Sequence, residues 1–187
     1  AQIEQELAEL KLQFGKNVLD STNAWELIIT DKARLAGMSD NWMAAAQADA
    51  AERGHGTPEN PAWRVTLKAG SANAVLRDCS VEETRRLCWE GQCSIGRGGQ
   101  YDNAAIVDKI MKLRRELAQL LGFASWADYK TKHRMVGSGT QAMAFVDGML
   151  ERLTPAFRVE GAELLAFANT RSGQKAATIA PWNLRYY

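Results

Sequence analysis

Residues 102–122 read DNAAIVDKIMKLRRELAQLLG and carry the strongest helical signal in the chain. Apolar residues recur there every three or four positions, as one face of an α-helix requires. These residues are Ile106, Ile110, Leu113, Leu117 and Leu120. Asp102 is expected to cap the start of the helix and Gly122 to end it. The segment therefore predicts a long amphipathic helix.

The same periodicity recurs on both sides of this segment. Further helices are expected at about 3–20, 31–37, 39–51, 80–93, 125–135 and 141–168. Two short stretches, Trp25–Thr30 and Trp63–Leu67, are expected to be extended. Ser80-Val81-Glu82-Glu83 and Ser125-Trp126-Ala127-Asp128 predict capping boxes, and Pro155 either kinks the last helix or opens a new one. The expected fold class is all-α, a multi-helix array with at most two short extended segments.

Composition limits the partners that the chain is expected to bind. It has 187 residues, of which 46% are hydrophobic and 24% charged, and a net charge of +1. A near-neutral chain offers no large field for nucleic acid or an anionic membrane, and no apolar run has the length of a membrane span. We therefore expect neither nucleic acid nor a membrane among its partners.

The cysteines and the N-terminus indicate a cytoplasmic protein. The three cysteines, Cys79, Cys88 and Cys93, form no regular disulfide framework, so a reduced thiol state is expected. The polar, acidic start of the chain does not resemble a secretory signal. Because the chain begins with Ala1 rather than Met, we expect residue 1 to be a fragment boundary.

Few residues have the types and spacing that metal binding requires. The only histidines are His55, in the Gly- and Pro-rich loop at 54–62, and His133, among basic residues; both are expected at the surface. No HExxH motif occurs, and a zinc site needs three or four convergent ligands. Cys88 and Cys93 are five residues apart on different faces of a predicted helix, so both are expected to be buried structural thiols.

Three other features have a structural and a functional interpretation. Gly96-Arg97-Gly98-Gly99 is expected to be a turn between helices; the alternatives are a phosphate cradle, whose Lys-Ser/Thr it lacks, and an arginine-glycine RNA element, of which it is a single copy. The basic cluster Lys109–Arg115 is expected to be a solvated helix face; the alternative is nucleic-acid binding together with Arg97. A set of aromatic residues is expected to pack in a core or an interface, the alternative being a ligand-binding wall. This set comprises Trp126, Tyr129, Trp182, Tyr186 and Tyr187.

Several segments, in order, resemble the thimet oligopeptidase and peptidyl-dipeptidase family of zinc metallopeptidases. The best match is Leu113–Phe123, which continues into Trp126-Ala127-Asp128-Tyr129. The closing Trp182–Tyr187 resembles the family's W-D-x-x-Y-Y segment. Further matches are Arg64–Leu67, Glu83–Leu87 and Tyr101–Ile106, with looser ones at Phe14–Asp20 and Leu35–Met38. Two departures are Asn183, where the family usually has Asp, and His133–Val136, where a Met-Ala pair is common.

The resemblance implies a nearly all-helical enzyme that admits short peptides to a deep channel. Its zinc would be held by HExxH and a downstream Glu, all beyond the equivalent of Tyr187. No catalytic, cofactor-binding or metal-binding residue is therefore assigned in this chain, and zinc is expected only in the full-length parent. The chain alone is expected to be inactive because it lacks HExxH. The Asn at position 183 would replace one member of a buried ion pair.

The combined expectation is a single helical fragment, 1–187, of a larger peptidase, with the loop at 54–62 as a candidate sub-boundary. It would form part of the channel wall and scaffold of a zinc-dependent enzyme that hydrolyses short peptides. A fragment of this kind exposes apolar surface, so a homodimer is expected through the helices around 103–121 or 141–168. The alternative is a stand-alone helical interaction module without enzymatic activity.

Overall fold

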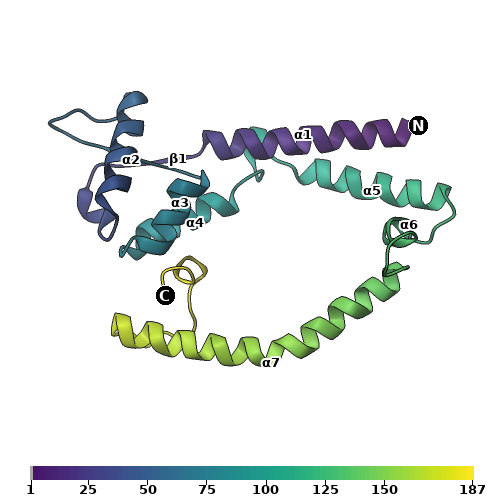
Figure 1. Ribbon diagram of the computed structural model, residues 1–187. Coiled ribbons are helices and arrows are strands. Elements are labelled where there is room, and N and C mark those ends of the chain that lie inside the picture. The colour runs from purple at the N-terminus through teal and green to yellow at the C-terminus, as the bar shows by residue number, and fades with distance from the viewer. Residues whose placement is uncertain (1) are drawn as a thin grey trace. The chain divides into compact units, whose positions relative to one another are not determined.

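The fold is mostly helical, as the sequence predicts. The computed structural model describes residues 2–187, and within them it has one sheet, formed by two antiparallel strands (Figure 1). The α-helices are α1 Gln2–Ala24, α2 Asp40–Glu52, α3 Ala69–Asp78, α4 Glu82–Cys93, α5 Ala104–Leu120, α6 Trp126–Thr131 and α7 Gly139–Ser172. The strands are β1 Glu26–Ile29 and β2 Trp63–Thr66, and three short 3-10 turns are η1 Lys32–Leu35, η2 Gly99–Tyr101 and η3 Pro181–Asn183. None of the helices between residues 2 and 187 combines the length and apolarity that a bilayer span requires.

The chain divides into two compact units. One, called here the α5–α6 unit, takes the chain up to Lys16 together with Asp102–Ala166. The other, called the sheet unit, takes Asn17–Tyr101 together with Phe167–Tyr187. The loop at 54–62 lies inside the sheet unit.

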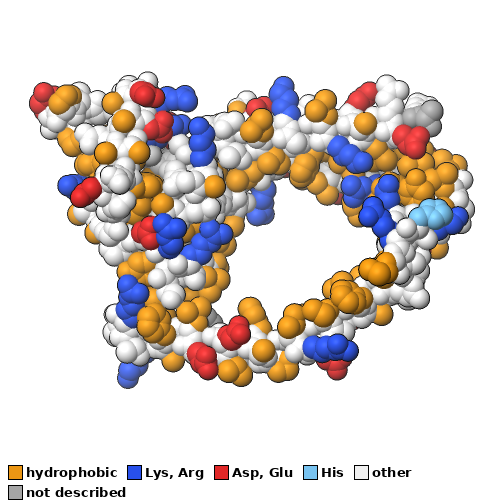
Figure 2. Space-filling view, in the orientation of Figure 1, with side chains coloured by type: hydrophobic (Ala, Val, Ile, Leu, Met, Phe, Trp, Pro, Cys, Tyr) orange, Lys and Arg blue, Asp and Glu red, His pale blue; other side chains and the backbone are white. Residues whose placement is uncertain are grey.

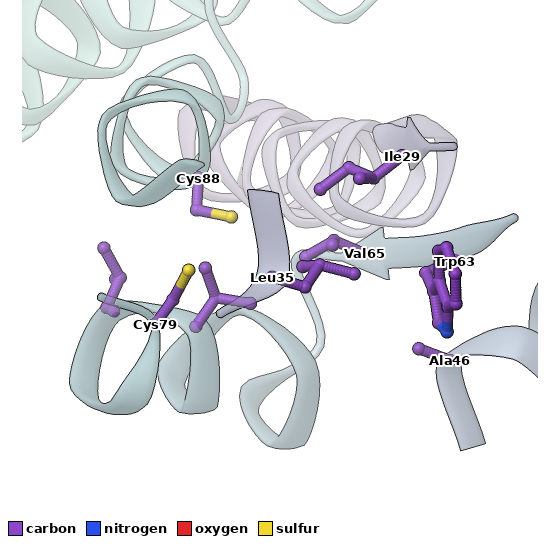
Figure 3. Close-up of a cluster of buried hydrophobic side chains, with 9 residues drawn as sticks. Ile29, Leu35, Ala46, Trp63, Val65, Cys79 and Cys88 are labelled. Atoms are coloured by element: carbon purple, nitrogen blue, oxygen red, sulfur yellow. The ribbon is translucent and has the colours of Figure 1, made fainter. Parts of the chain in front are cut away.

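The core of the sheet unit surrounds β2, which is buried along its whole length. The strands pair in antiparallel register, with Ile29 opposite Trp63, and β2 packs against α2 and α3. Figure 3 shows this cluster, in which the Cys79 and Cys88 side chains point into the space between α3 and α4. Burial of these apolar side chains is the main term that stabilises the unit.

Trp25 packs directly on the backbone of α4. An ideal Cβ at Gly91 would lie 2.4 Å from Cε2 of the Trp25 ring, closer than side-chain atoms approach. Gly91 therefore permits the contact between the start of the first strand and the last turn of α4. A side chain at this position would displace the indole ring.

Of the two predicted capping boxes, the serine cap of one is confirmed and the other is wrong. Ser125 accepts a hydrogen bond from the Asp128 amide at 3.1 Å and caps α6, which ends at Thr131, earlier than expected. Ser80 does not cap α4; its hydroxyl donates to the Ala36 carbonyl at 3.0 Å. The N-cap of α4 is Val81, which makes no side-chain capping bond. The Ser80 hydroxyl, which the sequence motif predicted to cap α4, therefore makes a tertiary hydrogen bond instead.

The α5–α6 unit pairs the start of α1 with α5 (Figure 1). Lys109 forms an ion pair with Glu6, and Asn103 donates from Nδ2 to the Phe14 carbonyl at 3.3 Å. Asp102 accepts from the Ala104 amide at 2.9 Å, but the N-cap of α5 is Asn103, one residue later than predicted.

Asp128 joins the ends of two helices. Its Oδ2 accepts from the Ser125 hydroxyl at 2.7 Å, and its Oδ1 accepts from the Gly139 amide at 2.9 Å, at the start of α7. These two donors, the Ser125 hydroxyl first, hold the pKa of Asp128 below its usual value. One carboxylate therefore fixes the turn between α6 and α7.

Helix α7 is continuous through Pro155, so a separate helix starting there is the wrong alternative. Figure 1 shows this helix curving along its length. Its large apolar residues are exposed at many positions, notably Met143, Phe145, Val146, Met149, Leu150, Leu153, Phe157 and Val159. A helix that is apolar on several faces normally lies against other protein.

Candidate functional site

A buried arginine joins α4 to the C-terminal turn η3. Arg85 is 2% exposed. Its Nη2 and Nε donate to Oδ1 of Asn183 at 2.7 and 3.1 Å, and its Nη1 donates to the Cys79 carbonyl at 2.6 Å. The guanidinium carbon lies 4.0 Å from the centre of the Tyr186 ring. Because a buried cation is costly without partners, these contacts fix the C-terminal turn on α4.

Glu82 completes this network on its outer side. Its Oε1 accepts from Trp182 Nε1 at 2.9 Å and from Asn183 Nδ2 at 3.0 Å. The Trp182 hydrogen bond, then that of Asn183 and the charge of Arg85, hold the pKa of Glu82 below its usual range. The Asn183 amide is oriented by its neighbours, since its oxygen must face the guanidinium and its NH2 the carboxylate.

The pair formed by Arg85 and Asn183 is a cation–amide pair. An Asp at position 183 would face the guanidinium as a counter-charge, but it would also face Glu82 without a proton to donate. The neutral amide serves both neighbours at once, accepting from Arg85 and donating to Glu82.

A second buried arginine fixes the sheet to α2. Arg64, which is 6% exposed, donates from Nε to Glu26 and from Nη1 to Asp49, both at 2.7 Å. His55 lies at the edge of this group, with Nε2 3.5 Å from Glu26 Oε1. The hydrogen bond from Arg64 is the main cause that holds the pKa of Glu26 below its usual value. Glu26 and Asp49 supply the acceptors for Arg64, so this network has a structural role and holds the sheet on α2.

The other residues with chemistry of their own do not converge. Cys88 is buried as predicted for a structural thiol, and burial raises its pKa to about 12. Cys79 is buried as well. Cys93 is exposed, so the expectation that it is buried is wrong; it lies on a different face of α4 from Cys88. His133 is exposed. Within residues 2–187 no group of three or more His, Cys, Asp or Glu is arranged to hold a metal ion.

The aromatic residues form two separate clusters in different units. In the α5–α6 unit, Tyr129 packs against Phe123 and Trp126 with ring centres 5.4 and 5.3 Å apart. In the sheet unit, Trp182 packs edge-on against Trp89 at 5.7 Å. Both clusters make the packing contacts that the sequence favours.

Part of the basic cluster Lys109–Arg115 lines a groove rather than an open helix face. The groove lies where α5 meets α6, with Lys112, Arg114, Arg115 and Trp126 among its lining residues. Spacing along α5 predicted the exposure of these cations. It gave no signal for Trp126, which comes from the next helix.

Comparisons with known proteins find relatives along nearly the whole chain. The sequence pattern of peptidase family M3 matches residues 75–187, which include both Arg85 and Asn183. Oligopeptidase A of Salmonella typhimurium is 32% identical over 191 residues, covering 100% of this chain and 27% of that protein. A probable cytosolic oligopeptidase A of Arabidopsis thaliana is 31% identical, covering 99% of this chain and 26% of that protein. Dipeptidyl carboxypeptidase of Escherichia coli is 27% identical, covering 97% of this chain and 26% of that protein. The chain thus spans about a quarter of the length of these relatives.

Proposed function

The chain belongs to peptidase family M3, and from that premise we propose that it is a non-catalytic helical part of a zinc-dependent oligopeptidase that hydrolyses short peptides. Support for the activity comes from relatives named oligopeptidase A and dipeptidyl carboxypeptidase, which align over nearly the whole chain. Support for a non-catalytic role comes from the side chains themselves.

The donor set of this chain does not fit a zinc site. Catalytic zinc sites use three protein ligands and a water. The two histidines, His55 and His133, lie in different units. Within residues 2–187, neither belongs to a group of three or more His, Cys, Asp or Glu that could hold a metal ion. We therefore propose that the zinc ligands and the catalytic residues belong to other parts of the protein.

The role proposed for this chain is scaffold and channel wall. The observation that carries it is the exposure of apolar side chains along α7, where Leu150 is 65% and Phe157 76% exposed. Such a face packs against the rest of the complete protein, and in the isolated chain it would pair with a second copy. The Arg85–Asn183 pair would hold the turn η3 on α4.

Zinc-dependent cleavage by the complete protein tests the activity. The whole protein encoded by the native reading frame and the 1–187 chain would be assayed side by side with a fluorogenic peptide. We expect the whole protein to cleave it, a chelator to stop cleavage and zinc to restore it, while the 1–187 chain stays inactive. Chelator-sensitive cleavage by purified 1–187 would overturn the non-catalytic role.

The reading frame itself separates this proposal from the stand-alone interaction module. A HExxH motif downstream of Tyr187 supports a peptidase. A stop codon soon after Tyr187 would instead support the stand-alone interaction module.

A cytoplasmic location is also proposed, supported by the relative named as a probable cytosolic oligopeptidase A. Cell fractionation with an antibody to this chain would test it.

A further inference from the structure

The groove at the junction of α5 and α6 has the size and lining of a binding site. Its volume is about 670 Å³, and its lining includes Met111, Lys112, Arg114, Arg115 and Trp126. Volumes of this order are typical of ligand sites. Figure 2 shows Lys and Arg side chains gathered over the part of the unit where α5 approaches α6.

The cations of this groove lack the carboxylate partners that several other cations in the chain have. Lys109 pairs with Glu6, and Arg86 bonds two carboxylates. By contrast, Lys112, Arg114 and Arg115 form no ion pair with any residue between 2 and 187. Asp108 is the one carboxylate among the lining residues, so the lining carries an excess of positive charge.

Arg114 has a polar atom in need of an acceptor. Its Nε is shielded from solvent and makes no hydrogen bond within the described chain. An unmade bond of this kind costs about 1–3 kcal/mol, so an incoming anion would relieve a cost that the free protein bears. A guanidinium is also the side chain best suited to bind a carboxylate through two parallel hydrogen bonds.

Trp126 gives the groove a rigid wall. Arg114 lies over its ring at 5.6 Å from the centre, and the Lys130 ammonium at 4.8 Å. The preceding Ser125 caps α6 and is held by Asp128, which fixes the start of the helix that carries the indole. Arg114 is therefore held against the ring before any ligand arrives, which lowers the cost of binding.

A second, apolar pocket adjoins the basic groove. Phe14, Val107, Ile110 and Met111 line a hollow of about 250 Å³ between α1 and α5. Met111 and Arg114 line both hollows, so the two lie side by side. A ligand that fills both must carry an apolar group next to its negative charge.

We propose that this composite groove binds an acidic peptide segment. Its carboxylates would face Lys112, Arg114 and Arg115, and a neighbouring aliphatic side chain would enter the pocket beside Phe14. This inference rests on the proposed function, because it names the class of peptide that the enzyme would prefer. A peptide fits better than nucleic acid, since the three cations adjoin an apolar pocket and the whole chain carries a net charge of only +1.

Equilibrium binding to the complete protein tests the proposal directly. The probes are amidated Leu-Asp-Asp and its neutral isostere Leu-Asn-Asn, each labelled with tetramethylrhodamine and followed by fluorescence anisotropy. Mass spectrometry verifies that each probe stays intact. We expect the acidic probe to bind about tenfold more tightly at low salt, with the difference shrinking as salt is added.

Charge reversal assigns the preference to the groove. Lys112→Glu with Arg115→Glu, two exposed positions, should abolish the preference for the acidic probe. Arg158→Glu with Lys175→Glu makes the same change of residues and charge at exposed positions outside the groove and should retain it. If the glutamate pair fails to fold by circular dichroism, the glutamine pair at the same positions replaces it, with glutamine controls.

Three results would overturn the proposal. The first is equal binding of the two probes by the unaltered protein. The second is a preference for the acidic probe that the groove variant does not change. The third is a single-stranded oligonucleotide that binds more tightly than the acidic probe and loses this binding in the groove variant. Peptide cleavage is scored separately. A charge preference without any cleavage would refute the peptidase function alone, whereas cleavage without a charge preference would refute the groove alone.

Discussion

Arg85 donates two hydrogen bonds to the Oδ1 atom of Asn183, a residue 98 positions later in the chain. The same amide donates to Glu82, so one neutral side chain bridges a buried cation and a carboxylate. The contact joins the first turn of α4 to η3. Loss of the bridge would leave the guanidinium with the Cys79 carbonyl as its remaining hydrogen-bond acceptor among the described residues.

Asn183→Leu should destabilise the protein strongly. The substitution keeps the branching at Cγ but removes the acceptor from a buried guanidinium, and we expect a loss of about 3 kcal/mol in the free energy of unfolding. Urea unfolding followed by circular dichroism measures it. A loss below about 1 kcal/mol, the range of an ordinary surface substitution, would show that the pair does not hold the turn.

Asn183→Asp is the matched control, because it keeps the oxygen that Arg85 requires. It removes the donor to Glu82 and adds a like charge beside that carboxylate. We therefore expect a smaller loss than for Asn183→Leu, and recovery of part of it when Glu82→Gln is added. Additive effects in this double-mutant cycle would contradict the coupling of the two positions through residue 183.

Gly91→Ala should also be destabilising, although alanine favours helices. The new methyl would meet the Trp25 ring at 2.4 Å, and overpacking of this kind costs about 1–3 kcal/mol. Gly148→Ala is the matched control within α7, since a Cβ there meets no atom within 4 Å. We expect it to stabilise by about 0.5–1 kcal/mol through helix propensity. Thermal melts that shift equally for both variants would contradict the close approach at Gly91.

The thiols should differ sharply in reactivity. Burial raises the pKa of Cys88 to about 12 and also raises that of Cys79, whereas Cys93 is exposed. At pH 8 iodoacetamide should label only Cys93 in the folded protein and all three cysteines after unfolding in urea. Mass spectrometry of tryptic peptides measures the labelling, and Cys93→Ser should abolish it in the folded state. Rapid labelling of Cys88 without urea would disprove its burial.

The turn between α6 and α7 should weaken in acid. The Ser125 hydroxyl, followed by the Gly139 amide, holds the pKa of Asp128 below 3.8, its usual value. A carboxylate whose pKa is lower in the folded state contributes stability that is fully present above the unfolded pKa. This stability is lost as the pH falls through the folded pKa. The free energy of unfolding should therefore decrease below about pH 4.

Asp128→Asn should reduce this acid dependence, because an amide cannot be titrated. Asp147→Asn, at an exposed position on α7 without a hydrogen bond or ion pair in the described chain, is the control and should leave the pH profile unchanged. Urea unfolding between about pH 3 and 6 would measure both variants. Identical pH profiles for Asp128→Asn and the unaltered protein would contradict the assigned role.

Local patterns predicted the elements well because they depend on residues close in sequence. The spacing of Ile106, Ile110 and Leu113 predicted α5, and β-branched and aromatic residues predicted both strands. The same reasoning failed at Ser80, although its motif matches that of Ser125. The hydroxyl of Ser80 is taken by a carbonyl 44 residues earlier, and no local pattern reports such a partner.

For the same reason, the sequence alone did not predict the candidate groove or the Arg85–Asn183 pair. The sequence located the cations of α5, but Trp126 comes from the next helix and Phe14 from the first. Asn183 departs from the family pattern, but its partner Arg85 lies 98 residues away. Tertiary contacts of this length follow from packing and not from periodicity.

Self-association of the isolated 1–187 chain is the last prediction, and it follows from the surface of α7. Leu150 and Phe157 are seven positions apart, two helical turns, and are 65% and 76% exposed. Leu150→Glu with Phe157→Glu places charge in this face and should convert a dimer into a monomer. Leu12→Glu alters a residue of α1 that is 76% exposed and should leave the dimer intact. Light scattering after size-exclusion chromatography measures both. A monomer at every concentration would contradict pairing through α7, and loss of the dimer only with Leu120→Glu would assign the interface to α5.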